Sequence, residues 1–486
     1  MSRGSGLEKP ALVAIDLGAE SCRVSLLRWH GHESPILGPR ISMVRRFANA
    51  PQDDGAAGWH WDLERICSEL EAGLRACADL APEGIASIGV TGWAVDYVRL
   101  DHSGKPLAPP FCYRDERTQA AMEAVHSILP AEKLYALTGV QIQPINTIYQ
   151  LCADKRAGVA DSTPWVNLPE YILNWLGAPR VAEYTNATHT GLVDPETRQW
   201  SEQIFNTAGL DLAAAPELVP PGSVLGPVRS DLRRLPAYSA TQLIAPACHD
   251  TASAIAGIPE RAGNWAYISS GTWSLVGVPL SRTLRTQEAF ARGFNNLGSA
   301  DGGVLFHRGI AGMWLLRQCM NTWGQQRTWA MAELIAEAQR LPAPDQLLDL
   351  DDPALLPPGD MTARINDQRK QRGLASLPAG CAAAPHYASL IFHSLAGRYG
   401  TLMGEIEQMT GARPHHICVV GGGSRNEYLN ALTSQSTGLP VVRCSAESST
   451  LGNFAIQWAR VEQPSGAIQP QAIAGKIAAL AEVEIV

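Results

Sequence analysis

The residues best suited to chemistry stand in the middle of the chain, in the run Cys248-His249-Asp250-Thr251. A small-residue helix is expected over 252–257, and a strand, a tight Ser270-Gly271-Thr272 turn and a second strand are expected over 265–278. Glycine permits positive φ, so two strands can reverse at this turn and leave backbone N–H groups pointing outward as an anion nest. A carboxylate just upstream of such a nest is typical of a catalytic base that faces a phosphoryl donor. In this sequence that carboxylate would be Asp250.

Each part of this pattern also has a plainer interpretation. Aspartate before a helix is commonly only an N-cap, and Ser-Gly-Thr is a common hairpin turn. The chemical interpretation gains weight because the pattern recurs near the N-terminus, where a strand over 11–16, the turn Leu17-Gly18-Ala19-Glu20-Ser21 and a strand over 22–29 follow one another. The wide spacing of the two copies predicts two related domains rather than a solenoid, and two nests could hold a polyphosphate between them.

Asp16 ends the first strand of the N-terminal copy. Hard cations prefer oxygen ligands and Mg²⁺ keeps several of its waters, so Asp16 is a candidate partner for Mg²⁺ or for its waters. The alternative is a turn aspartate that accepts hydrogen bonds from its own loop.

A third candidate for ligand binding is Gly421-Gly422-Gly423, which follows an expected strand over 417–420 and precedes a helix over 427–436. Backbone without Cβ atoms can lie against a base or a ribose, and helix N-termini favour anions. The loop lacks the dinucleotide fingerprint because Asn426 stands where its last glycine would be. By itself this run is weak support for nucleotide binding.

Two polar clusters could contact a sugar. Trp93 could stack on a sugar ring and Asp96 could accept its hydroxyls, although a core tryptophan beside a turn aspartate explains the same residues. The cluster from Tyr113 to Thr118 could bind a polyol, or it could be the solvated start of a helix.

Composition narrows the classes of function. The 486 residues suffice for two to four domains, and 45% hydrophobic and 18% charged residues are typical of a globular protein. A formal net charge of -8 argues against a nucleic-acid partner. Ten cysteines without a CxxC pair indicate reduced thiols, and no stretch is apolar enough for a secretory signal or a membrane span, so a cytoplasmic enzyme is expected. P-loop, HExxH and GxSxG sequences do not occur, which removes three further enzyme classes.

The remaining elements supply the scaffold. A helix is expected over 59–81 and a long helix over 384–411, while 184–188 reads as a loop and 339–378 as a polar insertion or outer subdomain. The Pro- and Gly-rich stretch 216–227 and the polar stretch after it favour a division into domains 1–245 and 246–486.

Taken together, these stretches resemble the FGGY carbohydrate kinases, and within that family the rhamnulokinase branch, over nearly the whole chain. The motifs that carry the resemblance are Asp16-Leu17-Gly18-Ala19, Trp93-x-Val95-Asp96, Tyr113-Arg114-Asp115-x-Arg117-Thr118, Asn146-Thr147-x-Tyr149-Gln150-Leu151, Glu183-Tyr184-Thr185-Asn186-Ala187-Thr188, His249-Asp250-Thr251-Ala252-Ser253, Ser269-Ser270-Gly271-Thr272-Trp273-Ser274, Gly421-Gly422-Gly423 and Ser449-Thr450-Leu451-Gly452-Asn453. The resemblance implies an α/β fold of two actin-like (ribonuclease H-like) ATPase domains with an interdomain cleft.

The resemblance also implies roles for single residues. Asp250 would be the proton acceptor. The positions implied to contact ATP are Ala19, Glu20, Ser21, Cys22, Arg23, Thr272, Arg317 and Gly422. The positions implied to face the sugar, the N-terminal domain being the sugar-binding side, are Ala94, His249, Asp250 and Thr251, to which the residues themselves add Trp93 and Asp96.

Four positions depart from the pattern of the rhamnulokinase branch. Thr91 stands where Asp is usual, Ala94 where Gly is, Gly309 where a substrate-binding Asn is, and Arg317 where a Gln near ATP is. A lost amide would leave a sugar hydroxyl unpaired, and such losses alter selectivity strongly. The residues implied in phosphoryl transfer therefore agree with the family pattern better than the residues that determine sugar selectivity.

The expectation is an ATP- and Mg²⁺-dependent kinase that phosphorylates a primary hydroxyl of a ketose, with L-rhamnulose to L-rhamnulose 1-phosphate as the first candidate. Alternatives are L-fuculose or a pentulose as substrate, or an actin-like protein that binds sugar or ATP without catalysis. The sequence leaves monomer and homodimer open.

Overall fold

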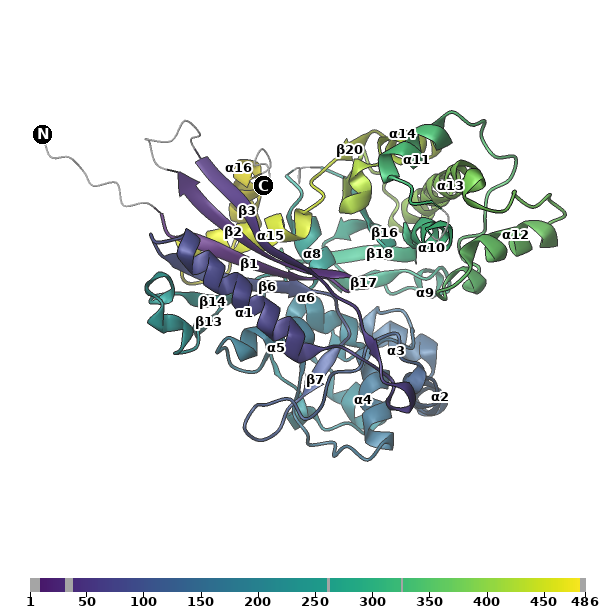
Figure 1. Cartoon of the computed structure of the whole chain (residues 1–486). Helices are drawn as coiled ribbons and strands as arrows, with labels where there is room; N and C mark the ends of the chain where they lie inside the picture. Colours follow the sequence, from purple (N-terminus) through teal and green to yellow (C-terminus); the bar gives the residue numbers. More distant parts are fainter. Residues whose placement is uncertain (1–8, 31–37, 260–262, 325–326, 481–486) are drawn as a thin grey trace, which may run out of the picture. The chain divides into compact units, whose positions relative to one another are not determined.

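The computed structural model describes residues 9–30, 38–259, 263–324 and 327–480 of the chain (Figure 1). Contacts divide the chain into two compact units. The first unit comprises Met1–Glu260, Leu280–Leu305 and Ser448–Val486, and the second unit comprises Arg261–Pro279 and Phe306–Glu447. The domain division after residue 245 stays a prediction, because compactness of contacts is a different criterion.

The first unit is built on a six-stranded sheet. Its strands lie in the order β13 (Ser223–Pro227), β14 (Gln242–Ala245), β6 (Ile85–Gly92), β1 (Ala11–Leu17), β2 (Ser21–His30) and β3 (Gly38–Ala48). The strands β1, β2 and β3 form an antiparallel meander, whereas β6 runs parallel to both β1 and β14. All seven residues of β1 are buried, as the continuous apolar run predicts for a central strand.

Helices and short strand pairs complete the first unit. Its helices are α1 (Leu63–Leu80), α2 (Gln119–Ile128), α3 (Ala131–Thr138), α4 (Thr147–Arg156), α5 (Leu168–Trp175), α6 (Tyr184–Ala187), α7 (Glu202–Ala208), α8 (Asp250–Ala256), α9 (Gln287–Ala291), α15 (Ser448–Glu462) and α16 (Pro470–Leu480). Its short pairs are β4 (Gln52–Asp53) with β5 (Trp59–His60), β7 (Tyr97–Arg99) with β8 (Trp165–Asn167), β9 (Val181–Glu183) with β12 (Glu217–Val219), and β10 (Val193–Asp194) with β11 (Gln199–Trp200).

The second unit repeats the same strand arrangement. Its strands lie in the order β18 (Val304–Ala311), β16 (Trp273–Leu280), β15 (Ala266–Ser270), β19 (Ile417–Val420) and β20 (Val441–Arg443). The central strand β15 pairs antiparallel with β16 and parallel with β19, and β19 pairs parallel with β20. The order β14-β6-β1-β2-β3 thus corresponds to β20-β19-β15-β16-β18, and the internal repeat expected from the two glycine turns is present in the fold.

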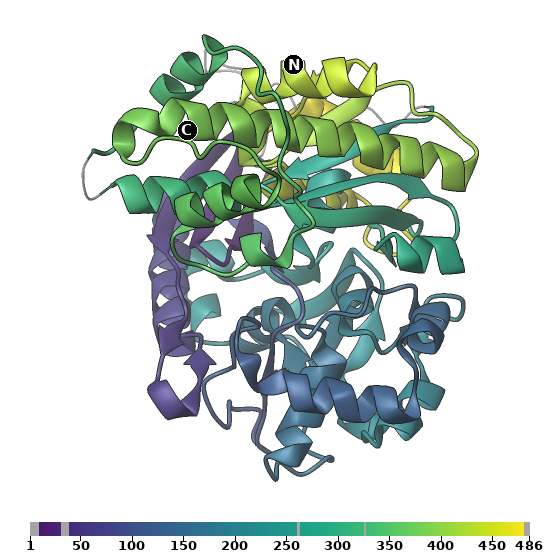
Figure 2. The ribbon, with the colours of Figure 1, turned by 90° about the vertical axis from the view of Figure 1, so that its right-hand side faces the viewer.

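The second unit contains the helices α10 (Trp314–Trp323), α11 (Met331–Gln339), α12 (Met361–Gln371), α13 (Ala384–Thr410) and α14 (Glu427–Thr437). The long helix α13, light green in Figure 2, packs along α14. Gly400 permits this approach, because a Cβ there would lie 2.7 Å from the carbonyl oxygen of Ser436.

Three segments differ from the expected elements. Residues 184–187 form the helix α6 rather than a loop, and all four of them are buried. The strand β3 was not predicted, because it is a partly exposed strand with arginines at 40, 45 and 46 instead of a clear apolar alternation. The polar stretch 339–378 contains the helix α12, which the composition did not indicate.

No helix in the part of the chain that the structure describes has the length and apolar character needed to cross a membrane.

Candidate active site

The helix α8 begins at Asp250 but is capped by the residue before it. His249 is the N-cap, and its Nδ1 accepts a hydrogen bond from the backbone N–H of Ala252 at 3.4 Å. Asp250 is therefore the first helical residue, and its carboxylate is not used as the cap. The plainer interpretation of Asp250 as a cap does not describe this helix.

The Asp250 carboxyl is held from one side. His249 Nε2 lies 3.3 Å from Oδ1, and Thr251 Oγ1 donates to the same oxygen at 3.2 Å. Within the described ranges, Oδ2 accepts from no side chain. The Asp250 side chain keeps 37% of its surface accessible. Burial and the neighbouring Asp16 charge raise the pKa of Asp250 to about 7, against smaller lowering effects of Thr251 and Arg23.

Asp16 lies at the end of β1 and is 3% exposed. Three groups approach its Oδ2: the hydroxyl of Ser449, the hydroxyl of Thr450 at 3.5 Å and Arg23 Nη1 at 3.5 Å. Arg23 stands opposite Asp16 in the β1–β2 register, so the antiparallel pairing itself brings the guanidinium to the carboxylate. The plain turn-aspartate interpretation fails to describe these contacts, which come from the neighbouring strand β2 and from the distant helix α15.

Two glycines bring Ser449 to this place. The helices α8 and α15 pack so closely that a Cβ on Gly452 would lie 1.8 Å from the carbonyl oxygen of Ser253, and a Cβ on Gly257 would lie 2.3 Å from that of Ser448. Ser253 Oγ also donates to the carbonyl of Ser449 at 2.7 Å. The close contact fixes the start of α15 against the middle and the C-terminal end of α8, and it thereby holds Ser449 in place.

A buried glutamate holds the segment between β14 and α8. Glu183 Oε2 accepts from the backbone N–H of Cys248 at 2.7 Å and from Thr185 Oγ1 at 2.5 Å, and Thr185 Oγ1 in turn accepts from the N–H of His249 at 3.4 Å. Burial raises the pKa of Glu183 to about 8, and the nearby Glu170 charge adds to the rise. The sequence placed Glu183 and Thr185 in a family motif but gave them no role, and their buried positions were hidden because the segment reads as a polar loop.

The N-terminal turn depends on glycine for a reason other than the expected one. Gly18 does not have a positive φ. A Cβ on Gly18 would lie 2.5 Å from the carbonyl oxygen of Ser21, so the tight path of the turn excludes a side chain. Of the positions expected near ATP here, Ala19, Glu20, Ser21 and Arg23 are partly exposed, whereas Cys22 is fully buried.

The second glycine turn belongs to the second unit, and Gly271 also lacks a positive φ. Its N–H donates to the carbonyl of Trp273 at 2.9 Å, so this N–H does not point outward as the sequence led us to expect. The carbonyls of Gly271 and Thr272 accept from the N–H groups of residues 312–314 at the start of α10. A Cβ on Gly271 would meet no atom closer than 3.7 Å, so the fold itself does not require glycine there.

In the run Gly421-Gly422-Gly423, the packing of the fold explains why glycine is needed at two positions but not at the third. Gly421 has φ +82° and lies against the backbone of Ser270, and a Cβ on Gly423 would collide with the Ser270 side chain. Gly422 is exposed, has no left-handed φ, and a Cβ there would meet nothing within 4 Å. Of the three, Gly422 is therefore the position where open backbone is left for another molecule.

The segment expected to face the sugar is more deeply buried than its polar residues indicated. Asp96 is fully buried, and its Oδ2 accepts from Trp61 Nε1 at 2.6 Å, from Trp93 Nε1 at 2.9 Å and from the N–H of Tyr113 at 3.3 Å. Burial raises the pKa of Asp96 to about 6. Trp93 and Ala94 are 7% and 8% exposed. The Asp96 carboxylate thus fixes two indoles in a preformed wall.

Val95, inside the same segment, has φ +72°. A β-branched residue in the left-handed region is strained, and such strain persists only where neighbours impose it. Here the Val95 carbonyl accepts from Thr147 Oγ1 at 2.7 Å and from Gln150 Nε2 at 3.3 Å. The backbone beside Ala94 is therefore held in one conformation by the start of α4.

Three further positions depart from the rhamnulokinase pattern. Thr91 is fully buried and donates to the carbonyl of Ile15 at 3.4 Å. Gly309 lies in β18, where a Cβ would touch Leu275 at 3.1 Å, and Arg317 is exposed on α10. A larger side chain at 309 would therefore press on Leu275.

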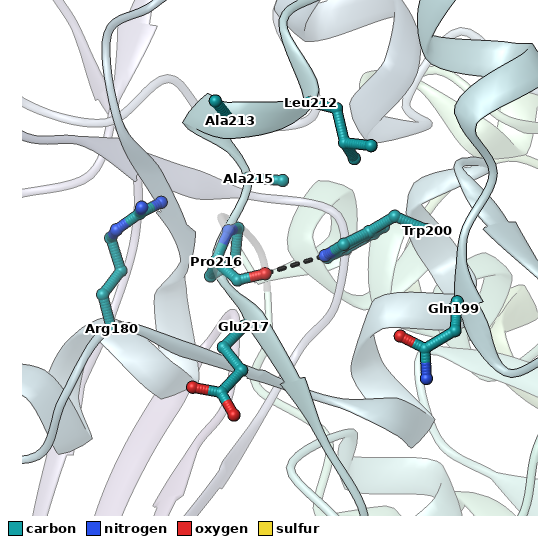
Figure 3. A pocket seen from close by; sticks show the side chains of 8 residues that line it. All are labelled: Arg180, Gln199, Trp200, Leu212, Ala213, Ala215, Pro216 and Glu217. Carbon is teal, nitrogen blue, oxygen red and sulfur yellow. Dashed lines mark hydrogen bonds between the residues drawn. The ribbon is translucent and has the colours of Figure 1, made fainter.

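Other hollows of the surface lie elsewhere in the first unit. One of about 570 Å³ is formed around β11 and β12, and Figure 3 shows Arg180, Trp200 and Glu217 among its lining residues. The indole N–H of Trp200 donates to the carbonyl of Pro216 at 2.7 Å. This hollow shares no residue with the site around Asp250, and an open surface of this kind carries no chemistry of its own. No group of three or more His, Cys, Asp or Glu suited to a metal ion occurs among the residues described.

Comparison with known protein families gives two consecutive matches. Residues 11–257 match the N-terminal domain of the FGGY family of carbohydrate kinases, and residues 266–460 match its C-terminal domain.

Individual relatives agree over most of their length. A rhamnulokinase of Enterococcus faecalis is 35% identical over 460 residues, which cover 93% of this chain and 89% of the relative. A rhamnulokinase of Oceanobacillus iheyensis is 33% identical over 454 residues and 93% of each chain. Among solved structures, a gluconate kinase from Lactobacillus acidophilus superposes with a TM-score of 0.76 at 14% identity, covering 96% of this chain and 92% of that one. At that identity the structural match shows the fold, which is the two-domain fold of this family.

Proposed function

The chain belongs to the FGGY family of carbohydrate kinases, and from that premise we propose that it transfers the γ-phosphoryl group of ATP to a primary hydroxyl of a ketose. The observation that carries the proposal is the Asp250 carboxyl, held at Oδ1 by His249 and Thr251, with its pKa raised to about 7. We propose L-rhamnulose as the substrate and L-rhamnulose 1-phosphate as the product, because the relatives at 33–35% identity are rhamnulokinases.

Asp250 is the proton acceptor in this proposal. A base with a pKa close to neutrality combines a useful ionised fraction with a useful proton affinity. Because both side-chain donors meet Oδ1, the second oxygen, Oδ2, is the one that takes the hydroxyl proton as the sugar oxygen bonds to phosphorus and the bond to the ADP oxygen breaks. The fixed Oδ1 contacts keep the carboxylate oriented for this transfer.

Asp16 fits the proposed Mg²⁺ in its donor chemistry. Its carboxylate and the hydroxyls of Ser449 and Thr450 are hard oxygen groups, and the contacts of the described side chains fall on Oδ2. The like charge of Asp16 also raises the pKa of Asp250, a repulsion that a divalent cation would relieve. Bound Mg²⁺ would neutralise charge on the phosphates, and Asp16 would hold it through its waters.

The nucleotide positions are proposed on the backbone. Gly271 and Gly422 have exposed backbone without a packing reason for glycine, which supports contact with ATP. We assign the remaining ATP contacts to the positions Ala19, Glu20, Ser21, Cys22, Arg23, Thr272 and Arg317.

The sugar side is proposed on the residues near Asp250. His249 and Thr251 flank the base, and the wall of Trp93 and Ala94, held by Asp96, offers a rigid surface. In this arrangement Asp96 acts by positioning the two indoles, because it is fully buried and both indole N–H groups donate to its Oδ2.

The test is a coupled ADP-release assay on a ketose panel with L-rhamnulose first, followed by L-fuculose and pentuloses. We expect ketose-stimulated ADP release, a kcat/KM that rises with pH through about 7, and a loss of at least about a hundredfold in Asp250→Asn. The matched control is Asp79→Asn, an exposed carboxylate on α1, which should keep wild-type turnover. A fully active, folded Asp250→Asn enzyme would remove Asp250 from the mechanism, and absent stimulation by any ketose would favour a non-catalytic binding protein.

We place the enzyme in the cytoplasm, on the ground that no disulfide is recorded among its ten cysteines.

A further inference from the structure

Two imidazole rings lie together beside the proposed base. His189 Nε2 is 3.1 Å from His249 Nδ1, and the ring centroids are 3.9 Å apart at an angle of 47°. The opposite nitrogen of His249, Nε2, is the atom 3.3 Å from Asp250 Oδ1. Two successive contacts thus connect His189 to Asp250 through His249. No motif of the sequence indicated a role for His189.

The position of His189 is itself well anchored. It lies in the single 3-10 turn η3 (Thr188–Thr190), which is fixed by hydrogen bonds from Thr188 Oγ1 to the carbonyl of Thr185 at 2.9 Å and from Thr190 Oγ1 to the carbonyl of Ala187 at 2.6 Å. The His189 ring therefore approaches His249 from a rigid support.

The contacts of His249 determine where its proton resides. The N–H of Ala252 can only donate, and at 3.4 Å this long hydrogen bond favours a lone pair on Nδ1 without fixing it alone. With Nδ1 unprotonated, the neutral ring carries its hydrogen on Nε2, which donates to the Asp250 carboxylate. The short contact at Nδ1 then requires His189 Nε2 to be the donor. A proton on His249 Nδ1 would face two donors at once.

We propose that His189 is a positioning residue that keeps the proton of His249 on Nε2 and so keeps Asp250 oriented and ionised. This inference rests on the proposed role of Asp250 as proton acceptor. His189 touches neither the base nor the reacting atoms, and it acts through His249.

The charges around the pair are those already described. Asp250 faces His249 from the start of α8, Asp16 and Arg23 reach Asp250 from β1 and β2, and Glu183 holds the backbone of the neighbouring Cys248. An imidazolium at His249 would pair with Asp250 and lower its capacity to accept a proton. The His189 N–H donor beside His249 Nδ1 disfavours this imidazolium, because the proton added at Nδ1 would point at the N–H of His189.

The test compares two substitutions of His189 in the full-length enzyme. His189→Met removes the donor at similar length, whereas His189→Gln keeps an N–H near the same place. His102→Gln, in an exposed turn of the first unit, is the control. Each variant is assayed for kcat, for the KM of the active ketose and for the pH profile of kcat/KM. Spectra of protein labelled with ¹⁵N-histidine, assigned with His249→Asn, report the tautomer of His249.

We expect His249 to be the neutral Nε2–H tautomer in the wild type and a mixture in His189→Met. The kcat of His189→Met should fall about 3- to 10-fold, as for one lost neutral hydrogen bond, more than KM rises, and the acid limb of the profile should move to higher pH. His189→Gln should restore the tautomer and most of the rate, and His102→Gln should match the wild type.

An unchanged tautomer and pH profile in His189→Met would overturn the proposal, whatever its kcat, and so would a His189→Gln variant no better than His189→Met. The tautomer is read without turnover, so a fully active Asp250→Asn enzyme would refute the role of Asp250 separately.

Discussion

Replacing Gly452 by alanine should separate the two helices that carry the site. The added Cβ would lie 1.8 Å from the carbonyl oxygen of Ser253, a backbone atom that cannot rotate away. An ordinary contact needs about 3.5 Å, so α15 must move from α8 by more than about 1 Å. Ser449, which donates to Asp16, lies one turn earlier on α15 and moves with it.

The size of the effect follows from this displacement. Overpacking of a close interface typically costs 1–3 kcal/mol and sometimes more, and a clash with backbone falls at the upper end, so we expect a loss of about 3 kcal/mol. A displacement of about 1 Å in a catalytic constellation can lower turnover about a hundredfold. Activity should therefore fall by more than the loss of folded protein explains.

The matched control is Gly475→Ala in α16. This glycine is also helical, but a Cβ there would meet nothing within 4 Å. Alanine should stabilise that helix by about 0.5–1 kcal/mol and leave kcat unchanged. Urea midpoints and ketose-stimulated ADP release are measured on both variants, and wild-type values of both in Gly452→Ala would refute the packing argument.

Two further predictions concern other residues of the site. Gly271→Ala and Gly422→Ala should raise the KM for ATP severalfold. They should leave the urea midpoint unchanged, because the added Cβ atoms meet nothing closer than 3.7 Å. Gly421→Ala should instead lower the urea midpoint, because Gly421 has φ +82°. An unchanged KM for ATP in both exposed-glycine variants would remove these turns from the nucleotide site. The pKa of Glu183 is about 8 in the folded protein and about 4.5 in the unfolded chain, so between these pH values the folded state binds a proton that the unfolded state has released. The free energy of unfolding should therefore fall by a few kcal/mol as the pH rises from about 4.5 to 8. Glu183→Gln should flatten the fall of the urea midpoint over that range, and an equal slope in the variant would contradict the assignment.

The sequence predicted the parts of this fold whose patterns are local. The two strand-turn-strand copies, the long helix α13 and the helix start at Asp250 all have strong periodicity or turn chemistry. Their correspondence extends to the order of five strands in each unit, which confirms the predicted repeat. The actin-like kinase family followed from the order of short motifs, and family matches and relatives confirm it.

The reasons behind single residues were harder to predict. Glycine at 18 and 271 suggested positive φ, yet Gly18 is required by a close carbonyl and Gly271 by nothing in the fold. Sequence gives the residue type but not its neighbours, so a glycine needed for its dihedral and one needed for close approach look alike.

The prediction of a loop within the segment from Glu183 to Thr190 was wrong for a related reason. Its polar residues are typical of a loop, but seven of its eight residues are buried, because the threonine hydroxyls and the Glu183 carboxylate meet a backbone group or another side chain.

The geometry of the proposed base therefore depends on polar contacts more than on apolar packing. The segment between β14 and α8 has backbone N–H groups at Cys248 and His249 that no strand or helix satisfies. A buried N–H needs a partner, and an apolar neighbour would leave it unsatisfied at a cost of about 1–3 kcal/mol. Glu183 and Thr185 supply these partners and at the same time fix where Asp250 begins its helix. A polar scaffold of this kind sets direction as well as proximity, since each hydrogen bond specifies which atom faces which.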